Sequence, residues 1–455
     1  MSPACSEDCK MRTRFLLRGG VVFLFIVACC RLGGSQANPA PAPPAVTLTL
    51  KEAVRLALKQ NPQVLAARIL SLESDRNRQI ARSGLLPQVS LSSNLALEQY
   101  NLQVFEKLPA PKAVGPFQYI EAGPVFSQSL LDLPLIRKYQ ISREGMRETR
   151  AQEDVTREDI TAAVVTQYLL VLRALAVYEA AKARVALAER LYEQATSLQK
   201  TGIGLSIDTT RAQVELQNER QNLIDAETQT HTTTYLLAEL LDLPSNQEPA
   251  VADKLGFFDL PAYDKQASIT TALAHRPEMQ ALASQERVAE LERKSASEQR
   301  FPRLDFSGLW YYQGEHFSDA IAAYTYLVSF DIPIFTGGRI QAETARADLE
   351  QKRIEQNRQL LEARIVREVK SAIDDLASAR TAVNVANLGL TLANEEVAQA
   401  QRRFQAGVTT NVEVVTAQDA LARANTNQIE ALYRFNQSRA NLARAMGEVE
   451  NTYAK

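Results

Sequence analysis

The chain has 455 residues, which is long enough for several ordinary domains, and its 51 basic and 53 acidic residues leave a net charge of -2. Proteins that bind nucleic acid carry a basic surface, so this charge balance argues against a nucleic-acid partner. All four cysteines, Cys5, Cys9, Cys29 and Cys30, lie near the N-terminus. The rest of the chain therefore has no disulfide framework.

Residues 1–37 have the composition of an export signal. Basic residues precede an apolar run from Val21 to Cys30, and Ser35–Ala37 resembles a cleavage site with small residues. One alternative is a lipoprotein signal that ends before Cys29, which would then carry the lipid; the other is an uncleaved anchor. Residues 38–46 follow as a stiff, Pro-rich linker. No later segment has 18 consecutive apolar residues, so we expect no transmembrane helix beyond the signal.

The remaining chain contains two copies of one unit, residues 47–250 and residues 251–455. Four short motifs recur in the same order; they are Asn61-Pro62 with Arg276-Pro277, Leu86-Pro87 with Phe301-Pro302, Pro124-Val125-Phe126 with Pro333-Ile334-Phe335, and Gly202 to Leu216 with Gly407 to Leu421. Such ordered self-similarity is the mark of a duplication. Each copy predicts a helix, two strands and a long helical hairpin.

The two predicted hairpins cover residues 133–241 and 338–447. Apolar residues recur every seven positions, as at Val383, Leu390 and Val397, with alanines in a companion row. This repeat predicts long helices that pack as coiled coils with closely spaced backbones. The helical run over residues 133–200 would span roughly 100 Å at the rise of an α-helix, far longer than the helices of globular proteins.

Each hairpin reverses at a glycine-containing segment, because glycine allows the backbone angles of a tight turn. The expected tip residues are Gly202, Gly204, Leu205 and Ser206 in the first hairpin, and Gly407, Val408, Thr409 and Thr410 in the second. Asp208 and Glu413 follow in the first turn of the next helix. A carboxylate there interacts favourably with the positive end of the helix dipole.

Four segments alternate between apolar and polar residues, near 86–99, 116–127, 302–313 and 323–335. The second of them is the weakest, because Glu121 and Gly123 fall on the side that we expect to be apolar. Half of the Phe, Tyr and Trp residues lie within 100–126 and 301–335. Strands of this length with clustered aromatic residues are typical of membrane β-barrels.

Four strands cannot close a barrel, since the smallest membrane barrels have about eight strands. Open strand edges are not tolerated in lipid, so several chains must contribute, and three chains would supply twelve strands. The alternative is a coiled-coil scaffold protein of the periplasm or cell surface, with a small soluble sheet and no pore. A channel would need detergent for extraction, whereas a scaffold would stay in water.

The chain resembles the TolC-like outer-membrane efflux proteins, also called outer membrane factors, over almost its whole mature length. The matching segments are Leu48 to Pro62, Leu86-Pro87, Pro333 to Arg339 and Arg403 to Gln418. The resemblance implies an α+β membrane protein with an internal duplication. It implies a trimeric twelve-stranded β-barrel, four strands per chain, continued by a long α-helical coiled-coil tunnel. The implied location is the outer membrane, with the tunnel extending into the periplasm.

The resemblance also implies a function as the passive exit duct of a tripartite efflux or type I secretion system. The implied partners of the homotrimer are outer-membrane lipid, a periplasmic adaptor (membrane fusion) protein that docks at the helix tips, and an inner-membrane pump of the RND, ABC or MFS type. Glu413 matches an acidic position that narrows the periplasmic entrance in the family, and Asp208 is its internal equivalent. Thr416 occupies the position where the prototype has a second acid. The alternative role for Glu413 is that of an ordinary first-turn carboxylate.

The sequence provides no argument for an enzyme. His231, His275 and His316 are scattered singly, without the spacing of metal ligands. Neither a Ser/His/Asp set nor a Cys/His set can be assembled from the residues. Gly202-x-Gly204 lacks the Lys-Ser/Thr of a phosphate-binding loop. We therefore expect no catalytic residue, no cofactor and no bound metal.

Overall fold

The computed structural model describes residues 46–102, 113–202, 204–261, 263–406 and 408–454. All of them belong to one compact unit, Pro43–Lys455. The predicted signal segment 1–37, the linker up to residue 45, the lipidation candidate Cys29 and the tip residue Gly407 lie outside the described residues. The interpretations of these segments stay predictions.

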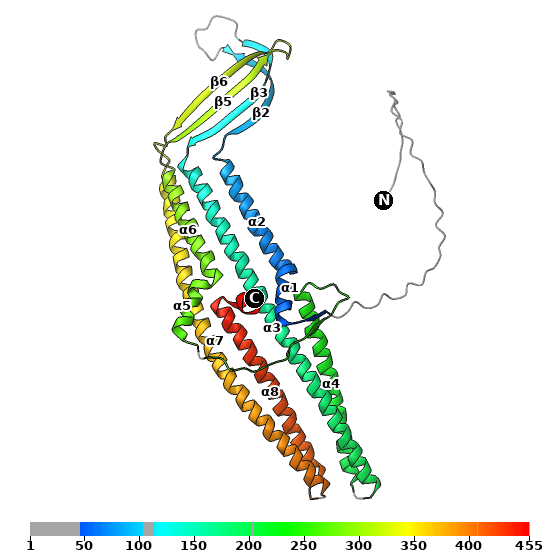
Figure 1. The fold of residues 1–455 in the computed structure, drawn as a ribbon. Helices are drawn as coiled ribbons and strands as arrows, with labels where there is room; N and C mark the ends of the chain where they lie inside the picture. The colour runs from blue at the N-terminus through cyan, green and yellow to red at the C-terminus, as the bar shows by residue number, and fades with distance from the viewer. Residues whose placement is uncertain (1–45, 103–112, 203, 262, 407, 455) are drawn as a thin grey trace, which may run out of the picture. The chain divides into compact units, whose positions relative to one another are not determined.

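The same order of elements occurs twice along the described chain (Figure 1). The first series is β1 (Val46–Leu48), α1 (Leu50–Gln60), α2 (Pro62–Ser83), β2 (Gln88–Asn101), β3 (Ala113–Leu131), α3 (Leu133–Lys200) and α4 (Ser206–Leu240). The second is β4 (Pro249–Val251), α5 (Lys265–His275), α6 (Pro277–Glu298), β5 (Arg303–Gly314), β6 (Ile321–Asp331), α7 (Arg339–Gln405) and α8 (Asn411–Met446), followed by α9 (Val449–Tyr453). The expected boundary between residues 250 and 251 falls inside β4, which pairs in parallel with β1.

Prolines begin α2 and α6. Pro62 and Pro277 each occupy the first helical turn, where the missing N–H costs nothing because that donor has no partner inside the helix. Asn61 also caps α2 by accepting the N–H of Gln63. The two prolines thus separate each short helix from the longer helix that follows it.

The strands differ from the expected segments mainly at their ends. β3 has 19 residues and extends beyond 116–127 on both sides. β6 ends at Asp331, so Ile332 and Ile334 of the expected segment 323–335 are not in the strand. Pro333 cannot donate to a neighbouring strand, and Gly337 and Gly338 take positive φ angles in the turn that leads into α7.

The strands form one antiparallel sheet in the order β2-β3-β5-β6. The register pairs Leu91 with Pro124, and it pairs Trp310 with Tyr324, so these residues share one apolar face. Glu121 and Gly123 do not lie on this face, which corrects our expectation for that segment. They lie on the polar face, where the Gln313 side chain donates to the Glu121 carboxylate at 3.0 Å.

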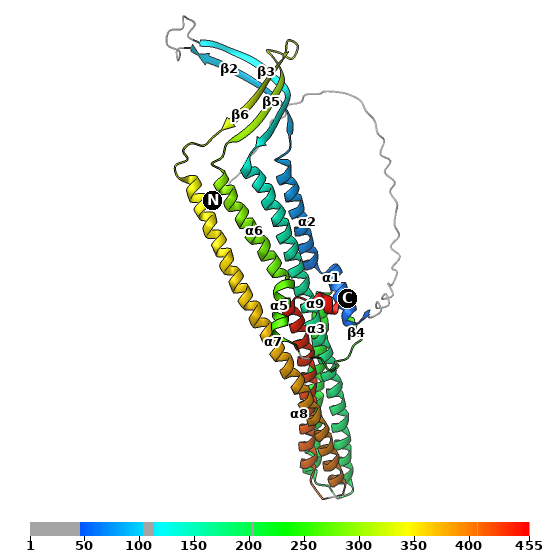
Figure 2. The same cartoon turned by 60° about the vertical axis from the view of Figure 1, so that its left-hand side comes forward.

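The helices next to the sheet follow the order of the strands. α2 packs on α3, α3 on α6, and α6 on α7, so each strand continues into or from a helix with the same neighbours. Figure 2 shows the four helices side by side, with the hairpins α3–α4 and α7–α8 at the end opposite the sheet. α3 has 68 residues and α7 has 67, about 100 Å each at the rise of an α-helix.

Apolar side chains form the largest core where α1, α3, α4 and β1 meet. Tyr168 is fully buried there, and its hydroxyl lies 2.9 Å from the Leu48 carbonyl and 2.8 Å from the Asp253 carboxylate. Burial, with the hydrogen bond to Asp253, holds the pKa of Tyr168 above its ordinary value. This core fixes the start of the first repeat against the middle of α3.

One described helix, α3, contains an 18-residue stretch that is long and apolar enough to cross a membrane, although we expected no such helix after the signal. The stretch is 56% buried inside the structure. A helix in the core of a protein meets the same criterion of length and composition. Since the apolar part of α3 packs around Tyr168, we interpret it as a core segment.

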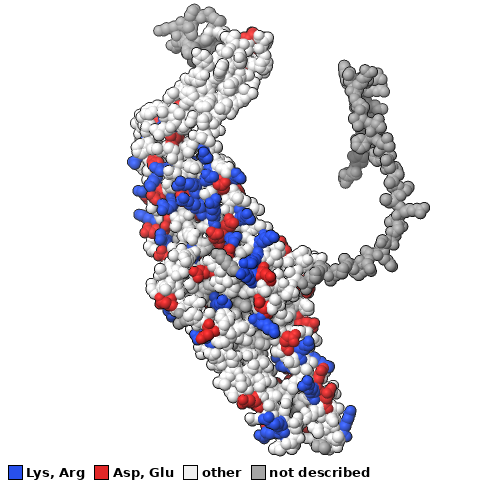
Figure 3. Space-filling model, in the orientation of Figure 1, with Lys and Arg blue, Asp and Glu red and all other residues white. Residues whose placement is uncertain are grey.

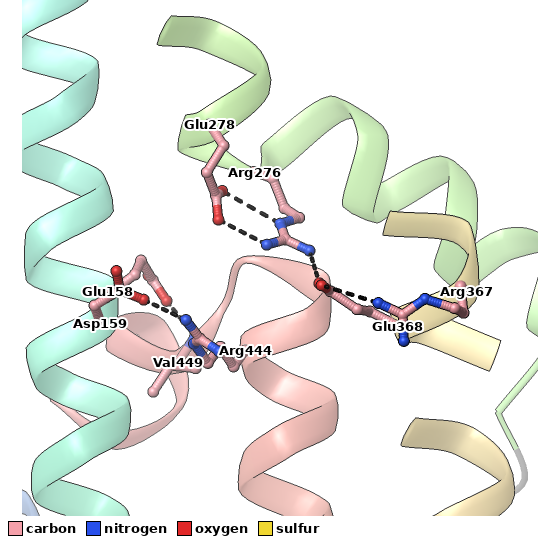
Figure 4. A network of polar contacts seen from close by, with 8 residues as sticks. All are labelled: Glu158, Asp159, Arg276, Glu278, Arg367, Glu368, Arg444 and Val449. Carbon is pink, nitrogen blue, oxygen red and sulfur yellow. Dashed lines mark hydrogen bonds and ion pairs between the residues drawn. The ribbon is translucent and has the colours of Figure 1, made fainter. Parts of the chain in front are cut away.

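Figure 4 shows two networks of charged groups, one around Arg276 within the second repeat and one between α3 and the C-terminal segment. Arg276 is only 6% exposed and lies 2.6 Å from both Glu278 and Glu368. Burial alone would raise the pKa of Glu278, but the Arg276 guanidinium outweighs it and lowers that pKa. Gly447 has a φ of +73°, and a Cβ there would lie 3.1 Å from the Arg276 Cα. The network thus depends on close backbone packing as well as on charge.

The second network holds the C-terminal helix α9 on α3. Glu158 accepts the backbone N–H of Val449 at 3.0 Å and that of Glu450 at 3.3 Å, and Arg444 pairs with Asp159 at 2.5 Å. Burial raises the pKa of Glu158, and the two accepted N–H groups oppose that rise only in part. These contacts fix the C-terminal segment to the middle of α3.

Candidate functional site: the helical tips

The first tip is a tight reversal between α3 and α4. Gly202 adopts a φ of +79°, which favours glycine. Gly204 donates its N–H to the Leu198 carbonyl at 2.9 Å, and a Cβ there would lie 2.9 Å from the Gln199 nitrogen. Any larger residue at 204 would collide with the end of α3. Leu205 then precedes α4 in an extended conformation, with 65% of its surface exposed.

The second tip joins α7 and α8 through Val408, Thr409 and Thr410. The N–H of Val408 donates to the Arg403 carbonyl at 3.0 Å, which closes the end of α7. Val408 is 70% exposed. Thr410 precedes α8 in an extended conformation. Both tips thus present an apolar side chain to solvent.

Asp208 and Glu413 lie at equivalent places in the first turns of α4 and α8. Asp208 pairs with Arg211 of its own helix at 3.3 Å. Glu413 pairs with Arg403 of α7 at 3.4 Å and also accepts a hydrogen bond from the Thr409 hydroxyl. The Glu413 side chain is 39% exposed. The carboxylate is thus oriented by its own hairpin and remains accessible to ions.

Small apolar side chains hold the two hairpins together near the tips. Leu191 and Ala195 of α3, Ala212 of α4, Val397 and Ala400 of α7, and Val414 and Ala417 of α8 form one buried cluster. Alanine brings backbones close but buries little apolar area, and the stabilisation scales with that area. Larger side chains, among them Tyr192 and Phe404, pack against this cluster, which is still smaller than the core around Tyr168.

A carboxylate that the sequence analysis missed lies between the hairpins. Glu215 of α4 faces Asp419 of α8 across a cavity of about 190 Å³, which Arg184 and Glu219 also line. Arg184 pairs with Glu219 at 2.9 Å. Burial, with the charges of Asp419 and Glu219, raises the pKa of Glu215. No short sequence pattern marks Glu215, because its acidic neighbour Asp419 belongs to the other hairpin and comes near it only when the hairpins pack.

The residues that the structure describes contain no group of three or more His, Cys, Asp or Glu side chains that could hold a metal ion. The acids of the tips instead pair with arginines. This arrangement can shape and charge an opening between helix ends. The combination of long hairpins with charged tips and an open sheet with an exposed apolar face is typical of a channel-forming membrane protein.

The chain belongs to the outer membrane efflux protein family, whose sequence pattern matches residues 53–242 and 268–448. It is 22% identical over 412 residues to the outer membrane protein TolC of Vibrio cholerae, covering 88% of this chain and 90% of that one. The two matched segments correspond to the two series of elements.

Solved structures share the fold. The CmeC outer-membrane channel of Campylobacter jejuni superimposes with a TM-score of 0.78 at 18% identity, covering 88% of this chain and 85% of CmeC. The outer-membrane protein VceC of Vibrio cholerae gives 0.76 at 15% identity, covering 88% and 96%.

The family supplies the class of function. The chain is an outer-membrane channel component of a tripartite efflux system, located in the outer membrane and extending into the periplasm. Members of the family work as trimers with adaptor proteins and inner-membrane pumps, and the family is one of transport proteins rather than enzymes.

Proposed function

We propose that three copies of this chain close into a continuous duct that crosses the outer membrane and opens into the periplasm. The observation that carries the proposal is the sheet. β2 and β6 are its outer strands, and their free edges would each need a partner in lipid. Pairing β2 of one copy with β6 of the next copy, three times around, gives a closed barrel of twelve strands.

The exposed apolar face of the sheet supports the same assembly. Leu91 is 81% exposed and Tyr324 is 71% exposed, and neighbouring positions on this face are exposed too. An apolar patch of this kind marks a surface that contacts lipid or a partner. The opposite face carries Glu121, Asp305 and Asp331, which suit a water-filled interior.

The helices extend the proposed duct. Because α2, α3, α6 and α7 keep the order of the strands, three copies arranged about the barrel axis would continue the wall as a ring of helices. Such a wall supplies a path and no energy. Cargo would therefore be driven by an inner-membrane pump, of the RND, ABC or MFS type, through a periplasmic adaptor protein.

The tips are the proposed gate and docking surface. Glu413, repeated in three copies, would form a ring of carboxylates at the periplasmic entrance, and Asp208 would add charge from the equivalent place in the first turn of α4. The adaptor would contact the exposed tip residues, above all Leu205 and Val408. Apolar side chains at a rigid turn are suitable anchors for a protein partner.

Partition and conductance test the proposal. The purified chain should need detergent, run as a trimer by mass, float with phosphatidylcholine vesicles, and give discrete single-channel currents in a planar bilayer. The matched variant Gly204→Val distorts one tip and leaves the sheet intact. It should still float and form trimers while export in cells fails. A water-soluble monomer without conductance would instead support the scaffold alternative.

A further inference from the structure

We propose that a basic collar beside the sheet binds the anionic headgroups of phospholipids in the periplasmic leaflet of the outer membrane. We define the basic collar as Arg76 of α2, Arg143 of α3, and Lys294 and Arg300 at the end of α6. The inference rests on the proposed function, because it requires the sheet to lie in the membrane.

The collar belongs to the helix ends that adjoin the sheet. At the rise of an α-helix, Lys294 lies about 6 Å from the end of α6, Arg76 about 10 Å from the end of α2, and Arg143 about 15 Å from the start of α3. Arg300 follows the end of α6 directly. The headgroup layer of a bilayer is about 5–8 Å thick on each side. Screening acts over about 8 Å at physiological salt. The collar thus lies at and just beyond the expected headgroup level.

Exposed apolar residues mark where the hydrocarbon would end. Leu86 is 48% exposed, Phe301 46%, Ile334 97% and Phe335 89%, and all four lie in the connections between strands and helices. Arg300 lies over the ring of Phe301 at 5.6 Å. An apolar level followed at once by cations is the arrangement of a protein surface at a membrane interface.

The surface of the sheet and that of the adjoining helices differ in charge. In Figure 3 the sheet surface is almost without charge between its ends, whereas the adjoining helical surface in the same view carries many Lys and Arg side chains, interspersed with Asp and Glu. Arg143 and Arg150 lie seven residues apart on one face of α3. Arg150 lines a cavity of about 540 Å³ together with Glu450 of α9. This face of α3 is therefore the face that carries the C-terminal helix.

Part of the collar charge is not neutralised by the protein. Arg76 donates only to the Gln79 side chain, at 3.0 Å, and Arg300 has its contact with Phe301. Neither forms an ion pair with another described residue. Arg143 approaches Glu144 at 3.4 Å, but Glu144 is shared with Arg147 at 2.8 Å. Lys294 is the fully paired member of the collar, at 2.6 Å from Glu290 of its own helix. Exposed cations of this kind attract anionic lipid.

The location of the collar selects lipid over a protein partner. The adaptor is proposed to dock at the tips, at the other end of helices about 100 Å long. The collar instead belongs to the helix ends that adjoin the sheet. A phospholipid offers both the phosphate for the cations and the acyl chains for Phe301 and Phe335.

The test compares phospholipid binding by two matched variants. Arg76→Gln, Arg143→Gln, Lys294→Gln and Arg300→Gln together remove the collar. Arg190→Gln, Lys200→Gln, Arg220→Gln and Arg402→Gln together remove the same charge from exposed positions near the tips. Delipidated trimer is titrated with phosphatidylglycerol or phosphatidylcholine in mixed micelles, and bound lipid is counted by native mass spectrometry.

We expect the wild type and the tip variant to prefer phosphatidylglycerol by at least about fivefold, the factor that one interfacial cation contributes. The collar variant should lose that preference, and inorganic phosphate at the same concentration should not compete. Equal binding of both lipids by the wild type, or an unchanged preference in the collar variant, would overturn the proposal. Competition by phosphate would reassign the collar to a free anion.

A flotation assay distinguishes a failure of this proposal from a failure of the proposed function. All three proteins should float with vesicles made only of phosphatidylcholine, because insertion of the sheet depends on its apolar face. Failure of the wild type to float would refute the membrane sheet itself, whatever the collar binds.

Discussion

The middle of the protein and its tips are held by contacts of different extent, because the middle has the large apolar core around Tyr168 in addition to its charged groups. In the middle, the buried Arg276 bridges two carboxylates, and Glu158 and Asp159 hold the C-terminal segment. At the tips, the contact between hairpins is a smaller buried cluster, largely of alanine and valine, with Tyr192 and Phe404 packed against it. Removing the large core or the nearly buried Arg276 is costly, whereas the smaller cluster at the tips buries less apolar area. We therefore expect the contact between the hairpins at the tips to be weaker than the contacts in the middle.

The largest expected effect comes from Arg276→Ala. Arg276 is itself nearly buried, and the change leaves the half-buried Glu278 and Glu368 without their shared cation, so the free energy of unfolding should fall by about 3 kcal/mol. Denaturant unfolding of the detergent-solubilised protein, followed by circular dichroism, measures the loss. Arg358→Ala is the control, because its pairs with Glu286 and Glu362 are exposed and worth less than about 1 kcal/mol. Equal effects of the two changes would show that the network does not stabilise the middle.

Leu191→Ala tests the apolar contact between the hairpins near the tips. Leu191 is 4% exposed within the apolar cluster, and removing its buried side chain should weaken the hairpin contact by about 2 kcal/mol. Hydrogen exchange should become faster in the ends of α3 and α7 and stay unchanged around Tyr168. Leu205→Ala, at an exposed tip position, should leave the exchange rates as they are. Faster exchange in the middle as well would mean that the two regions open together.

Glu413→Ala tests the charge at the entrance. The change removes three carboxylates from a trimer, so single-channel conductance should rise or the block by divalent cations should weaken. Glu227→Ala, an exposed acid of α4 away from the tip, serves as the control. Single-channel behaviour identical to that of the wild type would leave Glu413 with only its helix-end role.

The smallest expected effect is that of Glu215→Gln. The raised pKa means that the folded protein binds this proton more tightly than the unfolded chain does. The stability should therefore fall as the pH rises from about 4.5, the ordinary pKa of Glu, through the raised pKa. Glutamine cannot ionise, so the variant should lack this fall and melt slightly higher at neutral pH. Glu219→Gln should act in the opposite direction, because it removes the partner of Arg184. Thermal melts between pH 4 and pH 8 measure this pH dependence. If the melting temperatures of wild type and Glu215→Gln change in parallel with pH, Glu215 does not cause the loss of stability.

The sequence by itself determined the long helices, the strand segments and the places of the turns. These features follow from local rules: a seven-residue apolar repeat for the helices, alternation for the strands, and glycine where the chain reverses, as at Gly202 and Gly204. The ordered motifs of the two repeats also carried the family, and with it the class of function. Each of these patterns involves residues that are close in sequence, so it can be recognised without knowing which other segments pack against it.

The tertiary structure decided which side chains share a face of the sheet and which distant residues come into contact. Glu121 and Gly123 belong to the polar face because the pairing of β3 with β2 sets the register, which local alternation alone had misplaced. Arg276 finds Glu368 across 92 residues of chain, and Glu215 meets Asp419 only when the two hairpins pack. Contacts between distant segments depend on the packing of the whole chain, so no local sequence pattern predicts them.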